Sequence, residues 1–190
     1  MHTIINKYSS DLINALKLNA MGEVTKLGAA MLQAWKSGSN IYFCGNGGSA
    51  GNANHLANDF IYGAGTGNGT GLRAESLSAN SAVLTCLAND IGYDNIYSEQ
   101  IRVKGNPGDI LIVLSGSGNS PNVVNAIDQA NKMGLATFAV LGFTGGRCKE
   151  LAQVPIHFEV HDMQIAEDLQ LIVGHMCMQW LSLQNLSVEQ

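Results

Sequence analysis

Two turns rich in glycine, serine and asparagine stand where short apolar runs end, and both have the composition of an anion-binding loop. The first, 45–49 (Gly-Asn-Gly-Gly-Ser), follows the apolar run 41–44 and precedes a helical pattern over 50–60. The second, 115–120 (Ser-Gly-Ser-Gly-Asn-Ser), follows the apolar run 110–114. A turn between a strand and a helix leaves backbone N–H groups free, and the helix dipole adds positive charge there. Together the turns predict a phosphorylated ligand.

The two turns differ in how specific they are. The turn 45–49 is equally typical of a tight strand-to-helix connection, and that interpretation stays open. The turn 115–120 is more specific, because three hydroxyl groups and a flexible backbone fall within six residues. It has neither the lysine of a Walker loop nor the glycine spacing of a dinucleotide fingerprint, so it does not indicate nucleotide hydrolysis.

Two histidine–carboxylate pairs could do chemistry beside these turns. His55 and Asp59 lie one helical turn apart and so share a face. Such a pair can bind one metal ion, or act as a base with its orienting partner, although in most proteins it only stabilises the helix. Glu167 and His175 are separated by eight residues, or about 12 Å of helical rise, and differ by about 80° in direction. One ion would reach both only near the limit of the two side chains.

His175 has an alternative interpretation, because it lies in the apolar stretch 171–176. A histidine there can simply be part of the core, but a buried imidazole needs a hydrogen-bonding partner. Asp168 and Gln170 are nearby candidates for that supporting role.

The pair Asn89 and Asp90 follows the apolar run 83–88, which predicts a buried helix ending at polar residues. A helix terminus is the simple interpretation of this pair. The alternative is that Asp90 is a pocket carboxylate that binds sugar hydroxyls.

The composition sets limits on the class of protein. The chain has 190 residues, of which 46% are hydrophobic, enough for one well-filled domain. No apolar run approaches a membrane span, and no secretory signal is visible at the N-terminus. The four cysteines are scattered without C-x-x-C spacing, which predicts buried thiols in a reducing compartment and a cytoplasmic location.

A net charge of -5 without a basic run argues against direct nucleic-acid binding. Only 13% of the residues are charged, which favours an oligomer.

The hydrophobic periodicity predicts the elements that must position these residues. Helical spacing covers 4–18 and 24–35 at the start of the chain and 164–185 at its end. Compact apolar runs between them predict buried strands of a parallel sheet with helices on both faces; these runs are 41–44, 110–114, 136–141 and 154–158. The glycine-rich segment 63–71 is expected to be a mobile loop.

The expected architecture is a single α/β domain over 1–190 whose first 37 residues form a helical extension. Ligands of such sheets bind beyond the carboxyl ends of the strands. The topology alone therefore predicts that Ser49 and the turn 115–120 share one pocket.

These motifs, in this order, resemble the sugar isomerase (SIS) domain family, and more closely its phosphoheptose isomerases. The resemblance covers nearly the whole chain and rests on 44–50, 87–93, 107–109, 115–123 and the histidine-bearing last helix. It implies a three-layer sandwich with a five-stranded parallel, flavodoxin-like sheet. It also implies a homotetramer that uses 1–37 for assembly, active sites at subunit interfaces, and bound zinc.

The resemblance assigns roles residue by residue. Phosphate binding is implied for Ser49, Ser115, Ser117 and Ser120, and contacts near the sugar for Asn46 and Asp90. Gly47, Asn89 and Gly116 lie within the same substrate-binding motifs. Zinc binding is implied for His55, Asp59, Glu167 and His175, of which Asp59, Glu167 and His175 are also the candidate catalytic residues. Asp59 stands where the family usually has glutamate, and Glu167 where it usually has glutamine.

The implied reaction converts sedoheptulose 7-phosphate to D-glycero-D-manno-heptose 7-phosphate, for lipopolysaccharide or capsule synthesis. A carboxylate and a histidine would move the proton, and zinc would stabilise the enediolate oxygen. Two alternatives stay open. One is a non-enzymatic SIS protein that binds the bacterial replication initiator or senses sugar phosphates. The other is an isomerase of a different phosphosugar for surface glycans. The two retained histidines and two carboxylates favour an enzyme.

Overall fold

The computed structural model describes residues 1–17, 20–65 and 70–184. Their centre is a parallel sheet of five strands in the order β2-β1-β3-β4-β5, which confirms the predicted fold class. The inner strands are continuous apolar runs because both faces of the sheet are covered. The strands are β1 (Asn40–Cys44), β2 (Arg73–Ser76), β3 (Ile110–Ser115), β4 (Ala136–Leu141) and β5 (Val154–His157).

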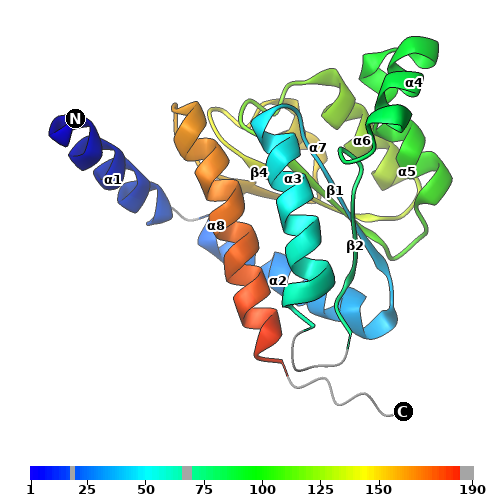
Figure 1. The fold of residues 1–190 in the computed structure, drawn as a ribbon, viewed down its shortest axis with the longest axis horizontal. Coiled ribbons are helices and arrows are strands. Elements are labelled where there is room, and N and C mark those ends of the chain that lie inside the picture. The colour runs from blue at the N-terminus through cyan, green and yellow to red at the C-terminus, as the bar shows by residue number, and fades with distance from the viewer. Residues whose placement is uncertain (18–19, 66–69, 185–190) are drawn as a thin grey trace.

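Helices form a layer on each side of this sheet (Figure 1). Within β1, Ile41 and Phe43 face one core, whereas Tyr42 and Cys44 face the other, as the alternation of a strand requires. The first core is closed by α2 (Met21–Ser37), α3 (Gly48–Asn58) and α8 (Met163–Ser182). The second is closed by α5 (Ser98–Lys104), α6 (Pro121–Lys132) and α7 (Gly146–Leu151). The helices predicted over 4–18, 24–35 and 164–185 are present as His2–Leu16, Met21–Ser37 and Met163–Ser182, and residues 18 and 185 lie outside the described residues.

The edge strand β2 was not predicted from the sequence, because it is not one of the four apolar runs. Its sequence Arg-Ala-Glu-Ser has only one apolar residue, and its side chains alternate between exposed and buried. A short, half-exposed edge strand needs no apolar run. The glycine-rich segment that precedes it was predicted to be mobile; residues 66–69 lie outside the described residues, and Gly63 belongs to a π-helical turn, η1 (Asp59–Gly63), that continues α3.

Helix α1 (His2–Leu16) extends away from the sheet (Figure 1). Only Ala15 of this helix is buried, and Ile4, Ile5 and Ile13 are at least half exposed. The Tyr8 hydroxyl donates to Asp168 Oδ2 of α8 at 2.6 Å. The pKa of Tyr8 is raised to about 12, mainly by burial and in smaller part by this hydrogen bond. Tyr8, Leu12 and Leu16 also pack against the first core, so one face of α1 is attached to the domain while its isoleucines stay exposed.

Helix α4 (Ser81–Ile91) corrects one expectation. The run 83–88 is helical, as predicted, but none of the residues of α4 is buried. The helix is started by Asn80, whose Oδ1 accepts from the backbone N–H groups of Ala82 and Val83. It lies at a corner of the molecule (Figure 1), followed by the short 3-10 turn η2 (Tyr93–Asn95). An apolar composition predicted burial, but only one side of this helix, through Leu84, Leu87 and Ala88, packs against the second core, and these residues stay partly exposed.

The strand order places a crevice at the carboxyl ends of β1 and β3. From β1 the chain crosses to β2 on one side, and from β3 it crosses to β4 on the other. Helices α3 and α6 therefore leave the same sheet edge in different directions, which is the position where open parallel sheets bind ligands. Among the helices of the described residues, none combines the length and the apolarity needed to cross a bilayer.

Candidate functional site

The two glycine–serine turns meet in a cavity of about 300 Å³ at this crevice, which we call the cradle. It contains seven of the nine residues predicted to bind substrate. Its lining residues are Asn46, Gly47, Gly48, Ser49, Leu114, Ser115, Gly116, Ser117, Ser120, Met163 and Glu167. The sheet topology thus brings together two turns that lie about seventy residues apart in the sequence.

The first turn depends on glycine at two positions. Gly47 has a φ of 56° and precedes α3 without any side-chain cap, so the first N–H groups of α3 face the cradle without a side-chain partner at the cap. At Gly45 a Cβ would lie 2.8 Å from the carbonyl oxygen of Leu114 in the neighbouring strand. Tyr97 fixes the turn from behind, because its hydroxyl donates to the Gly45 carbonyl and burial keeps its pKa above the usual value.

The second turn is held by backbone bonds to the loop after β4. The Gly118 N–H donates to Ser115 Oγ at 3.0 Å, and the Gly118 carbonyl accepts from Cys148 N at 2.9 Å. Gly118 has a φ of 67°, and a Cβ there would lie 2.0 Å from the Gly145 carbonyl oxygen. Helix α6 then begins at Pro121 with no side-chain cap from Ser120. The hydroxyl of Ser120 is thus not used to start the helix.

Three predicted metal ligands form what we call the histidine cluster. His55 Nε2 lies 3.0 Å from His175 Nε2, and Asp59 Oδ2 lies 3.3 Å from each of these nitrogens. These three are the residues of a group that could hold a metal ion. Tetrahedral ligands at zinc–ligand distances of 2.0–2.1 Å are separated by roughly 3.4 Å. The donor set and its spacing therefore fit zinc, with a fourth coordination position not filled by this group.

The cluster exists because α3 and α8 run side by side in the same direction. At the start of the pair, Asn52 Nδ2 donates to the Glu167 carbonyl at 3.0 Å. Further along, a Cβ at Gly174 would lie 2.3 Å from Leu56 Cδ2, so the two helices approach closely there. His55 is seven residues beyond Gly48, which is about 10 Å of rise. The cradle and the histidine cluster therefore lie along one helix pair, about 10 Å apart.

Glu167 lies in the cradle and does not belong to the histidine cluster of the described residues. Its carboxylate oxygens lie 2.4 Å and 2.5 Å from where a Cβ on Gly48 would be, at the first turn of α3. The expected four-ligand set is corrected in this respect. Eight residues of a straight helix separate Glu167 from His175 by about 12 Å, so one metal ion cannot easily reach both side chains.

Asn89 and Asp90, the other two predicted substrate contacts, do not line the cradle. Both are exposed on α4, where Asp90 Oδ1 accepts from Asn89 Nδ2 at 2.8 Å. Asp90 Oδ2 also lies 3.6 Å from the thiol sulfur of Cys86, and this bond raises the pKa of that thiol. Within one chain, these polar groups bond to each other and not to the cradle.

Several residues that support the cradle were not predicted, or were assigned to another partner. Asn122 and Tyr93 both contact Asn46: the two amides exchange bonds of 2.8 Å, and the Tyr93 hydroxyl donates to Asn46 Oδ1 at 3.0 Å. Gln170 was a candidate to orient His175, but its Nε2 donates to Ser49 Oγ at 3.0 Å. Buried amides at the start of a helix are the signal that could have revealed Asn122, because they need partners.

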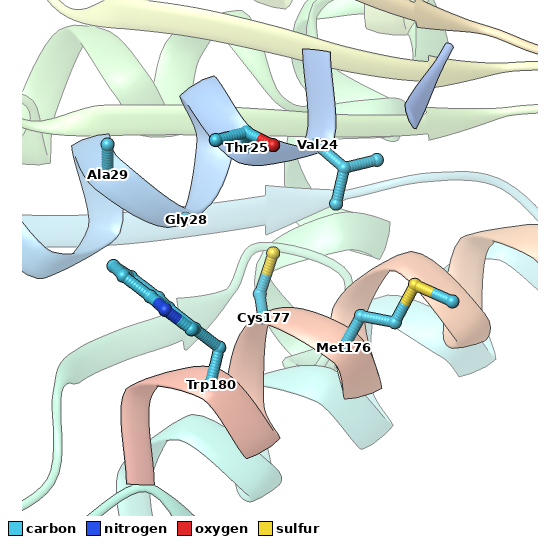
Figure 2. A pocket seen from close by; sticks show the side chains of 7 residues that line it. All are labelled: Val24, Thr25, Gly28, Ala29, Met176, Cys177 and Trp180. Atoms are coloured by element: carbon cyan, nitrogen blue, oxygen red, sulfur yellow. The ribbon is translucent and has the colours of Figure 1, made fainter. Parts of the chain in front are cut away.

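A second hollow lies away from the cradle, between α2 and α8, and has a volume of about 280 Å³. Figure 2 shows Met176, Cys177 and Trp180 on α8 pointing toward α2. The ring of Trp180 covers Gly28, since a Cβ there would lie 3.4 Å from the ring. This groove is apolar, and burial raises the pKa of Cys177 to about 12. It has no group suited to the chemistry of the histidine cluster.

Comparison with known proteins agrees with this geometry. The SIS domain family matches residues 6–142. A phosphoheptose isomerase of Akkermansia muciniphila is 36% identical over 155 residues, which are 82% of this chain and 82% of that protein. A phosphoheptose isomerase of Chlorobaculum parvum is 36% identical over 172 residues, covering 88% of this chain and 81% of the relative.

Solved structures show the same relationship. The phosphoheptose isomerase of Neisseria gonorrhoeae superposes with a TM-score of 0.85 at 26% identity, covering 95% of this chain and 97% of that one. Family, relatives and fold all coincide over the segment that carries both glycine–serine turns. The chain therefore belongs to the SIS domain family, and within it to the phosphoheptose isomerases, which makes it a phosphosugar isomerase.

Proposed function

We propose that this isomerase interconverts sedoheptulose 7-phosphate and D-glycero-D-manno-heptose 7-phosphate. One observation carries the proposal: an anion cradle and a cluster of two histidines and a carboxylate lie about 10 Å apart along the same helix pair. An extended phosphosugar placed with its phosphate in the cradle would bring its other end to the cluster. The relatives named phosphoheptose isomerase support this choice of sugar.

The phosphate would be bound by hydroxyl groups and backbone N–H groups. Ser49, Ser115, Ser117 and Ser120 line the cradle, and α3 begins there with no side-chain cap. Fixing the phosphate end positions the reacting carbons, so binding energy from a remote group serves the chemical step. Asn46, Gly47 and Gly116 line the same cavity and complete the substrate-binding set.

The proton transfers would be carried out at the histidine cluster. Aldose–ketose isomerisation removes a proton from the carbon beside the carbonyl and returns it to the neighbouring carbon. Asp59 is the proposed base, because a metal ion bound through Oδ2, which lies 3.3 Å from His175 Nε2, leaves the other carboxylate oxygen to take the proton. His175 is the proposed acid–base partner of Asp59 only when no ion is bound. Glu167 is a further proposed catalytic carboxylate; because it lines the cradle, it would lie at the phosphate end of the substrate.

A divalent metal ion, zinc, is part of the proposal. His55, Asp59 and His175 would hold it, since their donor atoms lie 3.0–3.3 Å apart. When bound, such an ion supplies a Lewis acid that stabilises a developing enediolate oxygen. The described geometry supports three protein ligands, and Glu167 would not be among them.

A homotetramer with active sites at subunit interfaces is proposed on the basis of the exposed apolar surfaces. Ile4, Ile5 and Ile13 of α1 and Ile91 of α4 are exposed, and the groove between α2 and α8 in Figure 2 is apolar. Residues 1–37 and the last helix would form most of the contacts. Asn89 and Asp90 could then reach the cradle of a neighbouring subunit, which would reconcile their predicted role with their exposure.

A cytoplasmic location completes the proposal. Cys44, Cys86, Cys148 and Cys177 are all free thiols, as expected for a protein that works in a reducing compartment.

Isomerisation of another phosphosugar for a surface glycan is the second candidate. The negative charge of Glu167 in the cradle, and the short arm of Asp59, favour it. Turnover on a panel of phosphosugars, with and without chelation of metal, tests both proposals. We expect sedoheptulose 7-phosphate to have the highest kcat/KM and chelation to abolish turnover. A higher kcat/KM for a hexose or pentose phosphate would replace the first candidate with the second.

A further inference from the structure

A layer of buried amides lies behind the cradle and contacts the residues that face the ligand. We infer that Gln170 and Asn122 are positioning residues that make Ser49 and Asn46 donate hydrogen bonds into the cavity, toward the oxygens of a bound phosphate ester. The inference rests on the proposed function, because it concerns how the same cavity recognises its phosphate. It adds two residues that do not themselves line the cavity.

The direction of the bonds at Ser49 follows from a backbone carbonyl. The Glu167 carbonyl can only accept, so the Asn52 side-chain atom 3.0 Å away is its Nδ2. That same nitrogen donates to Gln170 at 2.9 Å, which makes the acceptor Gln170 Oε1. Gln170 Nε2 must then donate to Ser49 Oγ at 3.0 Å. The hydroxyl oxygen of Ser49 accepts from behind, and its own proton is left for the cavity.

The bonds at Asn46 are fixed in the same way by a backbone N–H. The Val123 N–H can only donate, so the Asn122 atom 3.0 Å away is its Oδ1. Asn122 Nδ2 then donates to Asn46 Oδ1 at 2.8 Å, and the Tyr93 hydroxyl donates to the same oxygen at 3.0 Å. Asn46 Nδ2 uses one N–H on Asn122 Oδ1 at 2.8 Å. Its second N–H is the group left for a ligand.

The serines of the second turn follow the same rule. Ser115 Oγ accepts from the Gly118 N–H at 3.0 Å, and Ser117 Oγ accepts from the Asn119 N–H at 3.4 Å. A backbone N–H cannot accept, so both hydroxyl protons point elsewhere. Four side chains from two separate turns therefore have their acceptor atoms engaged within the protein and keep a donor free.

These free donors suit the oxygens of a phosphate ester, which accept hydrogen bonds. The one charged side chain among the lining residues of the cradle is the carboxylate of Glu167, which can only accept, so phosphate binding relies on neutral donors and the start of α3. Gln170 is 1% exposed and Asn122 1%, which keeps their orientation free from competition by solvent.

Replacement of Gln170 by glutamate reverses the bond at Ser49. A carboxylate can only accept, so the Ser49 hydroxyl would turn its proton away from the cavity and toward residue 170. The matched control is Gln100→Glu, which also introduces a carboxylate at a buried glutamine, 4% exposed. Gln100 bonds to the carbonyls of Leu77 and Ile96, outside the cradle, and accepts from Lys104 at 3.2 Å.

The test is calorimetric titration with methyl phosphate at pH 8, where the ester is a dianion because its second pKa is about 6. We expect Gln170→Glu to weaken binding about 10- to 100-fold and Gln100→Glu to leave it unchanged. In a Ser49→Ala background, Gln170→Glu should weaken binding much less, since the group through which it acts is gone. Gln170→Met, which adds no charge, should weaken binding a few-fold by the same route, and serves if the glutamate variant does not fold.

Equal loss from Gln170→Glu with and without Ser49 would overturn the inference, because repulsion by charge alone gives that result. Unchanged binding in both Gln170 variants would also overturn it. Steady-state kinetics separate this inference from the proposed function. If wild-type protein turns over sedoheptulose 7-phosphate but the variants keep its KM, only the inference fails. If no sugar is turned over but methyl phosphate binding follows the expected pattern, only the proposed function fails.

Discussion

The side chains that line the cradle carry one charge between them, and it is the negative charge of Glu167. A carboxylate beside an anion site weakens the binding of a phosphate by repulsion, which partial exposure to water reduces without removing. Glu167 lies beside the first turn of α3, where the helix dipole favours negative charge. The same helix start therefore favours both the protein carboxylate and the proposed phosphate.

Replacement of Glu167 by glutamine removes that competition. We expect Glu167→Gln to lower the KM for sedoheptulose 7-phosphate on the order of fivefold, because like-charge repulsion is relieved. Glu167→Asp, which keeps the charge, is the matched control and should not lower KM. Steady-state kinetics of the three proteins provide the measurement. A KM that rises in the glutamine variant would mean that the carboxylate helps to hold the substrate.

The histidine cluster gives a second prediction at this scale. We expect His175→Ala and His55→Ala each to lose bound zinc and activity together, because each removes one of three ligands. His2→Ala on α1 is the control, since it removes a histidine outside the cluster and should keep full metal content. Elemental analysis after dialysis decides the matter. Full zinc occupancy in the His175 variant would remove that residue from the metal site.

At the scale of elements, the register between α3 and α8 determines whether the cluster can form. Gly174 permits this register, because any side chain there would collide with Leu56. His55 lies on the turn of α3 that contains Leu56, and His175 follows Gly174 directly. A change in the distance between the two helices would therefore separate the two imidazoles.

Gly174→Ala is expected to lower the free energy of unfolding by about 1–3 kcal/mol and to weaken zinc binding, because the added methyl group pushes the helices apart. Gly51→Ala is the control on α3, where a Cβ would meet nothing within 4 Å. That substitution should instead stabilise the protein by about 0.5–1 kcal/mol through helix propensity. Urea unfolding measures the change in the free energy of unfolding of each variant, and the two changes should have opposite signs. Equal stability of both variants would contradict the close approach of α3 and α8.

Helix α4 can be examined through its cysteine. Cys86 is exposed, whereas the other three thiols are buried, and burial raises the pKa of Cys148 to about 12. We expect one thiol of the dissociated chain to react rapidly with iodoacetamide. The hydrogen bond to Asp90, and its charge, raise the pKa of Cys86, so Asp90→Asn should lower that pKa and speed the reaction near neutral pH.

Asp94→Asn is the matched control for this labelling experiment, because Asp94 is acidic and close in sequence but is not bonded to the thiol. Mass spectrometry after timed quenching reports the rate at Cys86. A slower reaction in the Asp90 variant would show that the carboxylate does not hold the thiol proton. Protection of Cys86 in the assembled protein would place α4 in an interface.

At the scale of the whole molecule, large apolar side chains are exposed to solvent in several places. Ile4, Ile5 and Ile13 on α1 are half exposed or more, and Trp180 of the groove in Figure 2 is 41% exposed. Large exposed apolar surface is typical of chains that bury it against other chains.

We expect Ile5→Glu on α1 to dissociate the proposed tetramer, because it places a charge in an apolar interface, while the fold of each chain is kept. Asn6→Glu adds the same charge at an exposed polar position of the same helix and should leave the assembly intact. Light scattering at micromolar concentration measures both. A wild-type protein that scatters as a monomer would contradict the tetramer itself.

The sequence predicted the features of the site that depend on a short stretch of chain. The turn 45–49 and the turn 115–120 could be recognised because glycine, serine and the start of a helix are local signals. The rule that parallel strands end at one edge then brought them together. His55 and Asp59 were paired for a similar reason, since one turn of helix fixes their spacing.

The features that the sequence did not predict depend on distant packing. The position of Glu167 follows from the register of α8 against α3, which no local pattern encodes. The exposure of α4 depends on how far the chain's own core extends, whereas the apolar composition of α4 predicted a buried helix. The partner of Gln170 could not be identified either, because a buried amide can bond to any polar group that the fold brings near it.

The parallel pairing of α3 and α8 also sets a length scale for substrates. Helices grow only by whole residues, and inserted residues rotate the helix as well as lengthen it, so a functional face returns only after about one turn, or 5.4 Å. The distance from the cradle to the histidine cluster can therefore change only in steps of about 5.4 Å if both are to keep facing the substrate. Selection among sugars that differ by one carbon atom must then come from the length of individual side chains. Aspartate at position 59 is shorter than glutamate by one methylene, which is a difference of that size.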